Sequence, residues 1–200
     1  MKRTSLFSKA LLGAAVVTLS FGMQSCKQEP KQEDPKEVAE DENEAKFDDV
    51  NDDKEKDSDY LVAAAEVDMK EIELGKLAQT KSTNADVKAL AKMMVDAHTK
   101  SLTDLKAAAA KKNISLPESF TEKGQDAYKD LNDKSGHDFD KAYADKMVEG
   151  HEKTIEKMEK ASEKATDADI RMWAANMLPE LRKHLEHAKM TKEKVDAIKA

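Results

Sequence analysis

Residues 85–112, ADVKALAKMMVDAHTKSLTDLKAAAAKK, show the pattern that decides the fold. Their apolar side chains return at alternating steps of four and three residues, which is the spacing of one face of an α-helix. The members of this stripe are Val87, Ala91, Met94, His98, Leu102, Leu105 and Ala109. Ser82–Asn84 offer a break and an N-cap before it, and Pro117 follows it. The segment therefore predicts one long amphipathic helix.

The same spacing occurs in three other segments, over about 59–79, about 137–164 and from Asp167 towards the C-terminus. The stripe members are Tyr60, Ala64, Val67, Glu71, Leu74 and Ala78; then Phe139, Tyr143, Met147, His151, Ile155 and Met158; then Ile170, Ala174, Met177, Leu181, His184, Ala188, Thr191, Val195 and Ile198. Residues 121–133 fit a short connecting helix. Four stripes with short connections predict an all-α protein, an up-down antiparallel four-helix bundle with a short extra helix between helices 2 and 3.

Composition agrees with a helical protein and excludes several classes of function. Aromatic residues make up only 4% of the chain, and Gly and Pro are few, which argues against an all-β sandwich. The formal net charge is -7, which argues against a nucleic-acid binder. A single cysteine excludes an intrachain disulfide framework and a cysteine-rich metal site.

The first residues have the features of an export signal. Lys2, Arg3 and Lys9 form a basic start, and Ala10–Phe21 is an apolar stretch too short to span a bilayer. A small residue then stands directly before Cys26, as in a bacterial lipobox. We predict a lipoprotein signal peptide over 1–25, with Cys26 lipidated and the protein held at a membrane by that anchor. The alternative is a plain secretory signal followed by an incidental cysteine.

The next segment is strongly acidic. Residues 27–59 hold 15 Asp and Glu against 6 Lys and have few large apolar residues. Such a composition buries too little apolar surface to offset the entropy of ordering. We therefore expect a disordered tether over 26–58 and the helical bundle domain over 59–200.

Each predicted stripe is interrupted by one residue able to ligate a metal: Glu71, His98, His151 and His184. A buried polar group without a partner is costly, so four of them in four helices suggest that they contact one another. Counted from the turns, they lie within about five residues of a common level, roughly 7 Å along the helices. One Glu and three His would form a four-coordinate site for zinc or copper(II), and imidazole also suits iron. The alternative is a set of hydrogen-bonded core residues without a metal.

No catalytic pattern accompanies these residues. A di-iron site of the ferritin type needs Glu three residues before His, where this chain has Val95, Val148 and Leu181. The sequence also contains no nucleophile elbow, phosphate-binding loop or dinucleotide fingerprint. We therefore predict that the protein is not an enzyme.

Several runs of residues, in order along the chain, resemble the family called domain of unknown function 4142. They are Glu71–Ala78, Val87–Ala91, Met94–Val95, His98–Lys100, Leu116–Pro117, Phe139–Tyr143, His151 and Leu178–Leu185. The resemblance covers about 60–190 and implies a ferritin-like bundle in bacterial envelope proteins, often described as outer-membrane proteins, without a known activity. This chain has Ala97 and Gly150 where the family often has an acid before His, so no role is assigned to an acid there.

Two functions remain open from the sequence. The first is a lipid-anchored protein of the bacterial envelope, expected at the outer membrane, that binds one zinc, copper or iron ion inside its bundle. The second is a metal-free structural or protein-interaction module of the envelope, whose protein partner the sequence does not identify.

Overall fold

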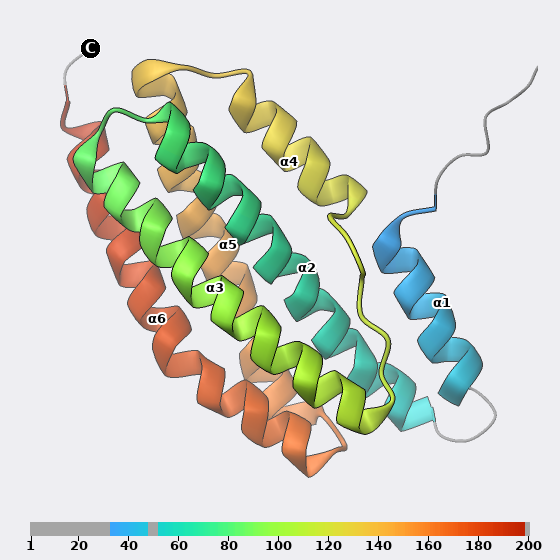
Figure 1. Cartoon of the computed structure of the whole chain (residues 1–200). Coiled ribbons are helices and arrows are strands. Elements are labelled where there is room, and N and C mark those ends of the chain that lie inside the picture. Colours follow the sequence, from blue (N-terminus) through green and yellow to red (C-terminus); the bar gives the residue numbers. More distant parts are fainter. Residues whose placement is uncertain (1–32, 48–51, 199–200) are drawn as a thin grey trace, which may run out of the picture. The chain divides into compact units, whose positions relative to one another are not determined.

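The computed structural model describes residues 33–47 and 52–198, and within these ranges every regular element is a helix (Figure 1). The all-α prediction is therefore confirmed. The helices are α1 (Pro35–Phe47), α2 (Asp52–Lys81), α3 (Ala85–Lys112), α4 (Glu122–Asn132), α5 (Gly136–Lys164) and α6 (Ala168–Asp196). The predicted connecting helix over 121–133 is α4, and the four predicted long helices are α2, α3, α5 and α6.

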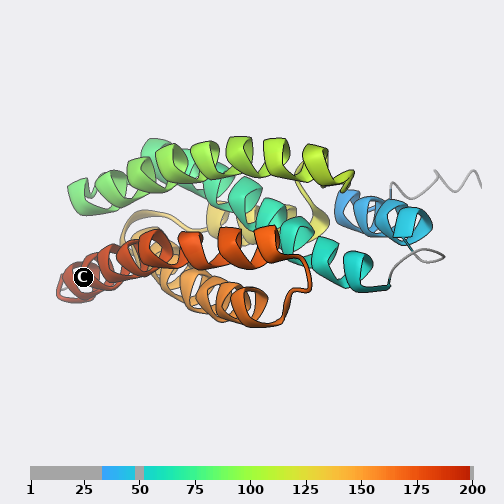
Figure 2. The ribbon, with the colours of Figure 1, turned by 90° about the horizontal axis from the view of Figure 1, so that it is seen from below.

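The four long helices form a bundle of two antiparallel hairpins (Figures 1 and 2). Helix α2 packs mainly on α3, and α5 packs mainly on α6. The hairpins then join through α2 against α5 and α3 against α6. Short local signals set the turns: Asn84 caps α3 by accepting hydrogen bonds from the backbone of Asp86 and Val87, and Asp167 caps α6 in the same way.

The second hairpin runs in a different direction from the up-down order predicted from the sequence. Helices α3 and α5 run in the same direction, because Lys112 at the end of α3 pairs with Asp167, whereas Lys81 bonds to Asn132 just before α5. Residues 113–135, including α4, therefore return the chain to the other end of the bundle. Asn113 ends α3 with a left-handed backbone (φ 58°), and the segment after it crosses the bundle. The ferritin-like topology remains a prediction.

The core has two apolar regions at the two ends of the bundle. One lies near the α2–α3 turn, and its larger members include Leu74, Leu90, Met94, Leu131, Phe139, Tyr143 and Met147. The other lies near the α5–α6 turn, with Leu61, Leu105, Met158, Ile170 and Leu181 among its members. Between these two regions each long helix contributes a buried polar or ionisable side chain, and this layer positions the candidate site.

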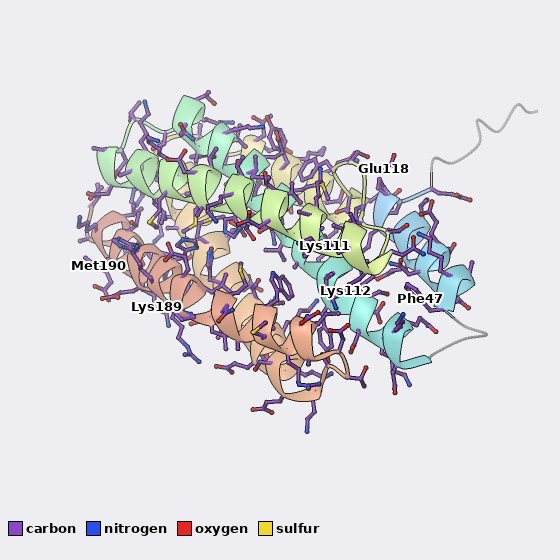
Figure 3. All side chains as sticks on the ribbon, turned by 60° about the horizontal axis from the view of Figure 1, so that its bottom comes forward. Phe47, Lys111, Lys112, Glu118, Lys189 and Met190 are labelled. Atoms are coloured by element: carbon purple, nitrogen blue, oxygen red, sulfur yellow. The ribbon has the colours of Figure 1, made fainter. Side chains whose placement is uncertain are left out.

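Helix α1 corrects the predicted disordered tether. Residues 35–47 are helical and α2 already begins at Asp52, so the tether over 26–58 and the domain start at 59 are wrong for these residues. One face of α1 is buried and consists of residues at steps of four, namely Ala39, Asn43 and Phe47. This face packs on the bundle, although the high charge of the segment predicted disorder. Figure 3 shows Phe47 at the end of α1, on the side of the bundle where α3 ends.

The predicted signal peptide over 1–25 and the predicted lipidation site Cys26 lie outside the described residues. Among the residues that the structure describes, no helix combines the length and the hydropathy needed to cross a membrane.

Asn43 links α1 to the segment that follows α3 through two hydrogen bonds. Its side-chain amide donates to the carbonyl of Ser115 at 2.9 Å, and its oxygen accepts from the Ser115 backbone N–H at 2.7 Å. Asn43→Ala removes both bonds and should lower the free energy of unfolding by about 1–3 kcal/mol, because the Ser115 backbone loses its partner. Urea unfolding measures the change, with Glu44→Ala on the exposed side of α1 as the control. Equal free energies of unfolding of the two variants would contradict this role of Asn43.

Candidate metal centre

Three histidines from three helices meet in the polar layer of the bundle. His98 comes from α3, His151 from α5 and His184 from α6, and each is at most 3% exposed. One ligand nitrogen from each ring can be chosen so that all three lie within 4.8 Å of one another. The ring centroids are 5.4–5.6 Å apart, so the three imidazoles form a nearly regular triangle.

His98 is oriented by a carboxylate from α2. Its Nδ1 lies 2.8 Å from Oδ1 of Asp68, and both side chains are buried. This contact assigns the ring proton to Nδ1, which donates to the carboxylate and leaves the lone pair on Nε2. A carboxylate behind a histidine is the arrangement that commonly orients metal-binding imidazoles in proteins.

His151 is oriented by its own helix. Its Nδ1 lies 2.8 Å from the carbonyl oxygen of Met147, one turn earlier in α5, and donates a hydrogen bond to it. The Nε2 lone pair of His151 therefore remains available, and Nε2 is buried without a hydrogen-bond partner among the described residues.

His184 has the least constrained ring of the three. Its Nε2 lies 3.2 Å from Oε1 of Glu180, one turn earlier in α6, but without the alignment of a hydrogen bond. Its Nδ1 has no hydrogen-bond partner in the described part of the chain. The ring can therefore present either nitrogen to a ligand.

The surroundings keep two of the three imidazoles in their neutral form at neutral pH. Burial lowers the pKa of His151, although the negative charge of Glu71 partly opposes the shift. Burial, followed by the charges of His98 and His151, lowers the pKa of His184 to about 4. Neutral imidazole is the form that binds metals, so His151 and His184 need not lose a proton before a cation binds.

Glu71 lies beside the triangle rather than in it. Its side chain is fully buried, and Lys70 Nζ is 3.8 Å from Oε1, yet neither oxygen accepts a hydrogen bond from a described residue. Gly150 makes room for it, since a Cβ atom there would come within 3.0 Å of Oε1. Of the four residues predicted from the sequence, the structure brings the three histidines into one group of ligand atoms, and Glu71 adjoins that group from α2.

Unpartnered polar atoms are concentrated at this place. Within the described residues, nine buried side-chain nitrogen or oxygen atoms lack a hydrogen-bond partner. Seven of these atoms belong to the three histidines, Asp68 and Glu71, and the other two belong to Asp140 and Tyr143. Burial without a partner normally costs about 1–3 kcal/mol for each polar group, so this concentration marks the layer as the candidate site of the described structure.

Sequence reasoning missed Asp68 and Gly150. Asp68 stands three residues before Glu71, so the helical spacing that located Glu71 would also have placed Asp68 on the same side of α2. Gly150 was noted only as the absence of an acid, and its role as space for Glu71 needs the packing of α2 on α5. Met94 and Met147, one turn before His98 and His151, lie in the apolar core region.

Comparison with known proteins identifies the family. The model of the family described as Domain of unknown function (DUF4142) matches residues 41–191. The chain belongs to the DUF4142 family. The match begins inside α1 and includes Glu71 and all three clustered histidines, which agrees with the resemblance seen in the sequence. Comparisons of this DUF4142 protein with curated proteins and with solved structures give no match.

Proposed function

We propose that this DUF4142 protein binds one transition-metal ion inside its helical bundle, through His98, His151 and His184. The observation that carries the proposal is the triangle of buried imidazoles, each with a nitrogen that has no hydrogen-bond partner among the described residues. A metal-free core would leave these nitrogens unpaired, whereas a cation would satisfy all three at once.

The spacing of the rings fits such an ion after a small adjustment. Tetrahedral ligands at about 2.1 Å from a metal lie roughly 3.4 Å from one another. The three nitrogens are within 4.8 Å of one another, so each needs to move by less than about 1 Å to reach that geometry. His184, whose ring is held least, can make much of this movement by rotating its side chain.

Three histidine ligands leave room for a fourth group. Glu71 offers two carboxyl oxygens that accept no hydrogen bond from a described residue, and a water molecule is another candidate. Three imidazoles with an oxygen ligand suit zinc or copper(II), and imidazole also suits iron. The buried position and the lack of a catalytic pattern favour storage, delivery or tolerance of the metal over a chemical reaction.

We also propose that the protein acts in the bacterial cell envelope, attached to a membrane through lipidated Cys26. Support comes from the basic and apolar leader and from the small residue before the only cysteine. The competing function, a metal-free structural or interaction module, makes an opposite prediction. In such a module, replacing a clustered histidine with leucine would leave the protein as stable or make it more stable, and added metal would have no effect.

Asp68→Asn tests the proposed metal centre without removing a ligand. The variant keeps the shape of the side chain but weakens the charged acceptor behind His98, so metal affinity should fall by about 10–100-fold. Competition with a chromophoric chelator measures the affinity. Asp96→Asn, on the exposed side of α3, is the matched control and should bind as the wild type does. Equal affinities of the Asp68 variant and the wild type would contradict the role of Asp68.

A further inference from the structure

A lysine-rich pocket lies on the outside of the bundle next to the candidate metal centre. It has a volume of about 260 Å³ and is formed by α2, α4 and α5. Five lysines line it, namely Lys70, Lys123, Lys146, Lys153 and Lys157. The acids in its lining are Glu66 and Glu149, so the pocket carries an excess of positive charge in a chain whose formal net charge is -7.

The charges in the pocket are only partly paired. Lys153 pairs with Glu149, and Lys123 Nζ is 3.6 Å from Glu66 Oε1. Lys146 forms no ion pair with a described residue, and the same holds for Lys157. The lining therefore holds more ammonium groups than carboxylates, and a bound anion would offset that excess of positive charge.

Gly150 is one of the residues of α5 that line the pocket. Lys146 precedes Gly150 by four residues and Lys153 follows it by three, so both lie on the same face of α5, one turn away on either side. Lys70 lines the same pocket from α2. The space beside Gly150 is taken by the Glu71 carboxylate, so an anion would lie in the outer part of the pocket, among the ammonium groups that line it.

We propose that this pocket binds a small oxyanion of the phosphate class, held by Lys70, Lys146 and Lys153, which line it. Lysine ammonium groups bind such anions as point charges and donate hydrogen bonds to several oxygens. The volume admits a compact anion, and the acidic balance of the chain disfavours a polyanion such as nucleic acid. The site rests on the pocket alone and does not require that a metal is bound.

The pocket also adjoins the polar layer. Gly150 forms part of its lining, and a Cβ atom at Gly150 would come within 3.0 Å of Glu71 Oε1. Lys70 adjoins both the pocket and the polar layer, because it lines the pocket and its Nζ lies 3.8 Å from Glu71 Oε1. Gly150 and Lys70 therefore border both the pocket and the Glu71 carboxylate of the polar layer.

The test is a calorimetric titration of the purified, chelator-treated protein with inorganic phosphate at constant ionic strength. We expect saturable binding by the wild type. Lys146→Gln/Lys153→Gln should weaken it about tenfold or more, because two charged donors are lost. Lys160→Gln/Lys164→Gln removes the same charge from exposed positions of α5 outside the pocket and should bind phosphate as the wild type does.

Two results would overturn the inference: no saturable binding by the wild type, or equal weakening in both double variants. Circular dichroism of each variant shows that the helical bundle is kept. Since the titration uses metal-free protein, its failure leaves the metal proposal untouched, and failure of metal binding leaves the oxyanion site standing.

Discussion

Replacing His98 and His184 together with alanine is expected to lower the affinity for the bound metal by about a thousandfold or more. The double variant removes two of three imidazole ligands from different helices, and one histidine beside Glu71 cannot hold an ion at comparable strength. Equilibrium competition with a chelator of known affinity measures the loss for zinc, copper(II) and iron in turn. Because alanine at position 98 also leaves the buried Asp68 carboxylate without its hydrogen bond, circular dichroism of the metal-free variant checks that the helical bundle is kept.

The chain supplies a matched control for this experiment. Its two other histidines lie outside the cluster: His187 is exposed on α6, and His137 is only partly buried at the start of α5. His137→Ala/His187→Ala removes the same number of imidazoles and should leave affinity unchanged. Equal losses in the two double variants would show that any bound metal sits on surface histidines, which contradicts the proposed centre.

The metal-free protein is expected to lose stability as the pH falls from about 6.5 to about 4. The pKa of His184 is lowered to about 4 in the folded protein, so the unfolded chain takes up its proton first. The free energy of unfolding is therefore highest above about pH 6.5 and falls as the pH drops to about 4. For this group the loss amounts to about 3 kcal/mol, since one pKa unit corresponds to about 1.4 kcal/mol. The lowered pKa of His151 adds to the loss in the same direction.

Urea unfolding of metal-free protein at a series of pH values measures this effect. His184→Leu is the informative comparison, because it removes the titrating group and fills its space with apolar atoms. The variant should show a smaller loss of stability between pH 6.5 and 4, and bound metal should also shift the wild-type curve by competing with protons. Parallel curves for the wild type and His184→Leu would show that His184 does not titrate abnormally.

Much of the architecture follows from one periodicity. The stripe through Val87, Met94 and Leu105 located α3, and similar stripes located α2, α5 and α6. The three histidines were predicted as a group because each occupies a core position of its stripe, where a polar residue needs a partner. The local pattern determined which face each histidine occupies, and the pairing of the helices brought the rings together.

The remaining features depend on contacts between distant segments. Helix α1 was missed because its charge hides a narrow buried face, and Asn43 finds its partner 72 residues later, at Ser115. The return of the chain through α4 to the other end of the bundle was not predicted, because the periodicity of a helix does not reveal the direction in which it runs. The position of Glu71 beside the triangle, rather than in it, depends on the close packing of α2 against α5 at Gly150.

The most direct test of the metal centre is the metal content of the protein itself. The protein, purified without a histidine tag, is incubated with zinc, copper or iron, desalted and examined by elemental analysis beside His98→Ala/His184→Ala. The proposal predicts about one equivalent of one metal in the wild type and background levels in the double variant. Background levels of every metal in the wild type would contradict it and would leave the histidine triangle as a structural feature of the core.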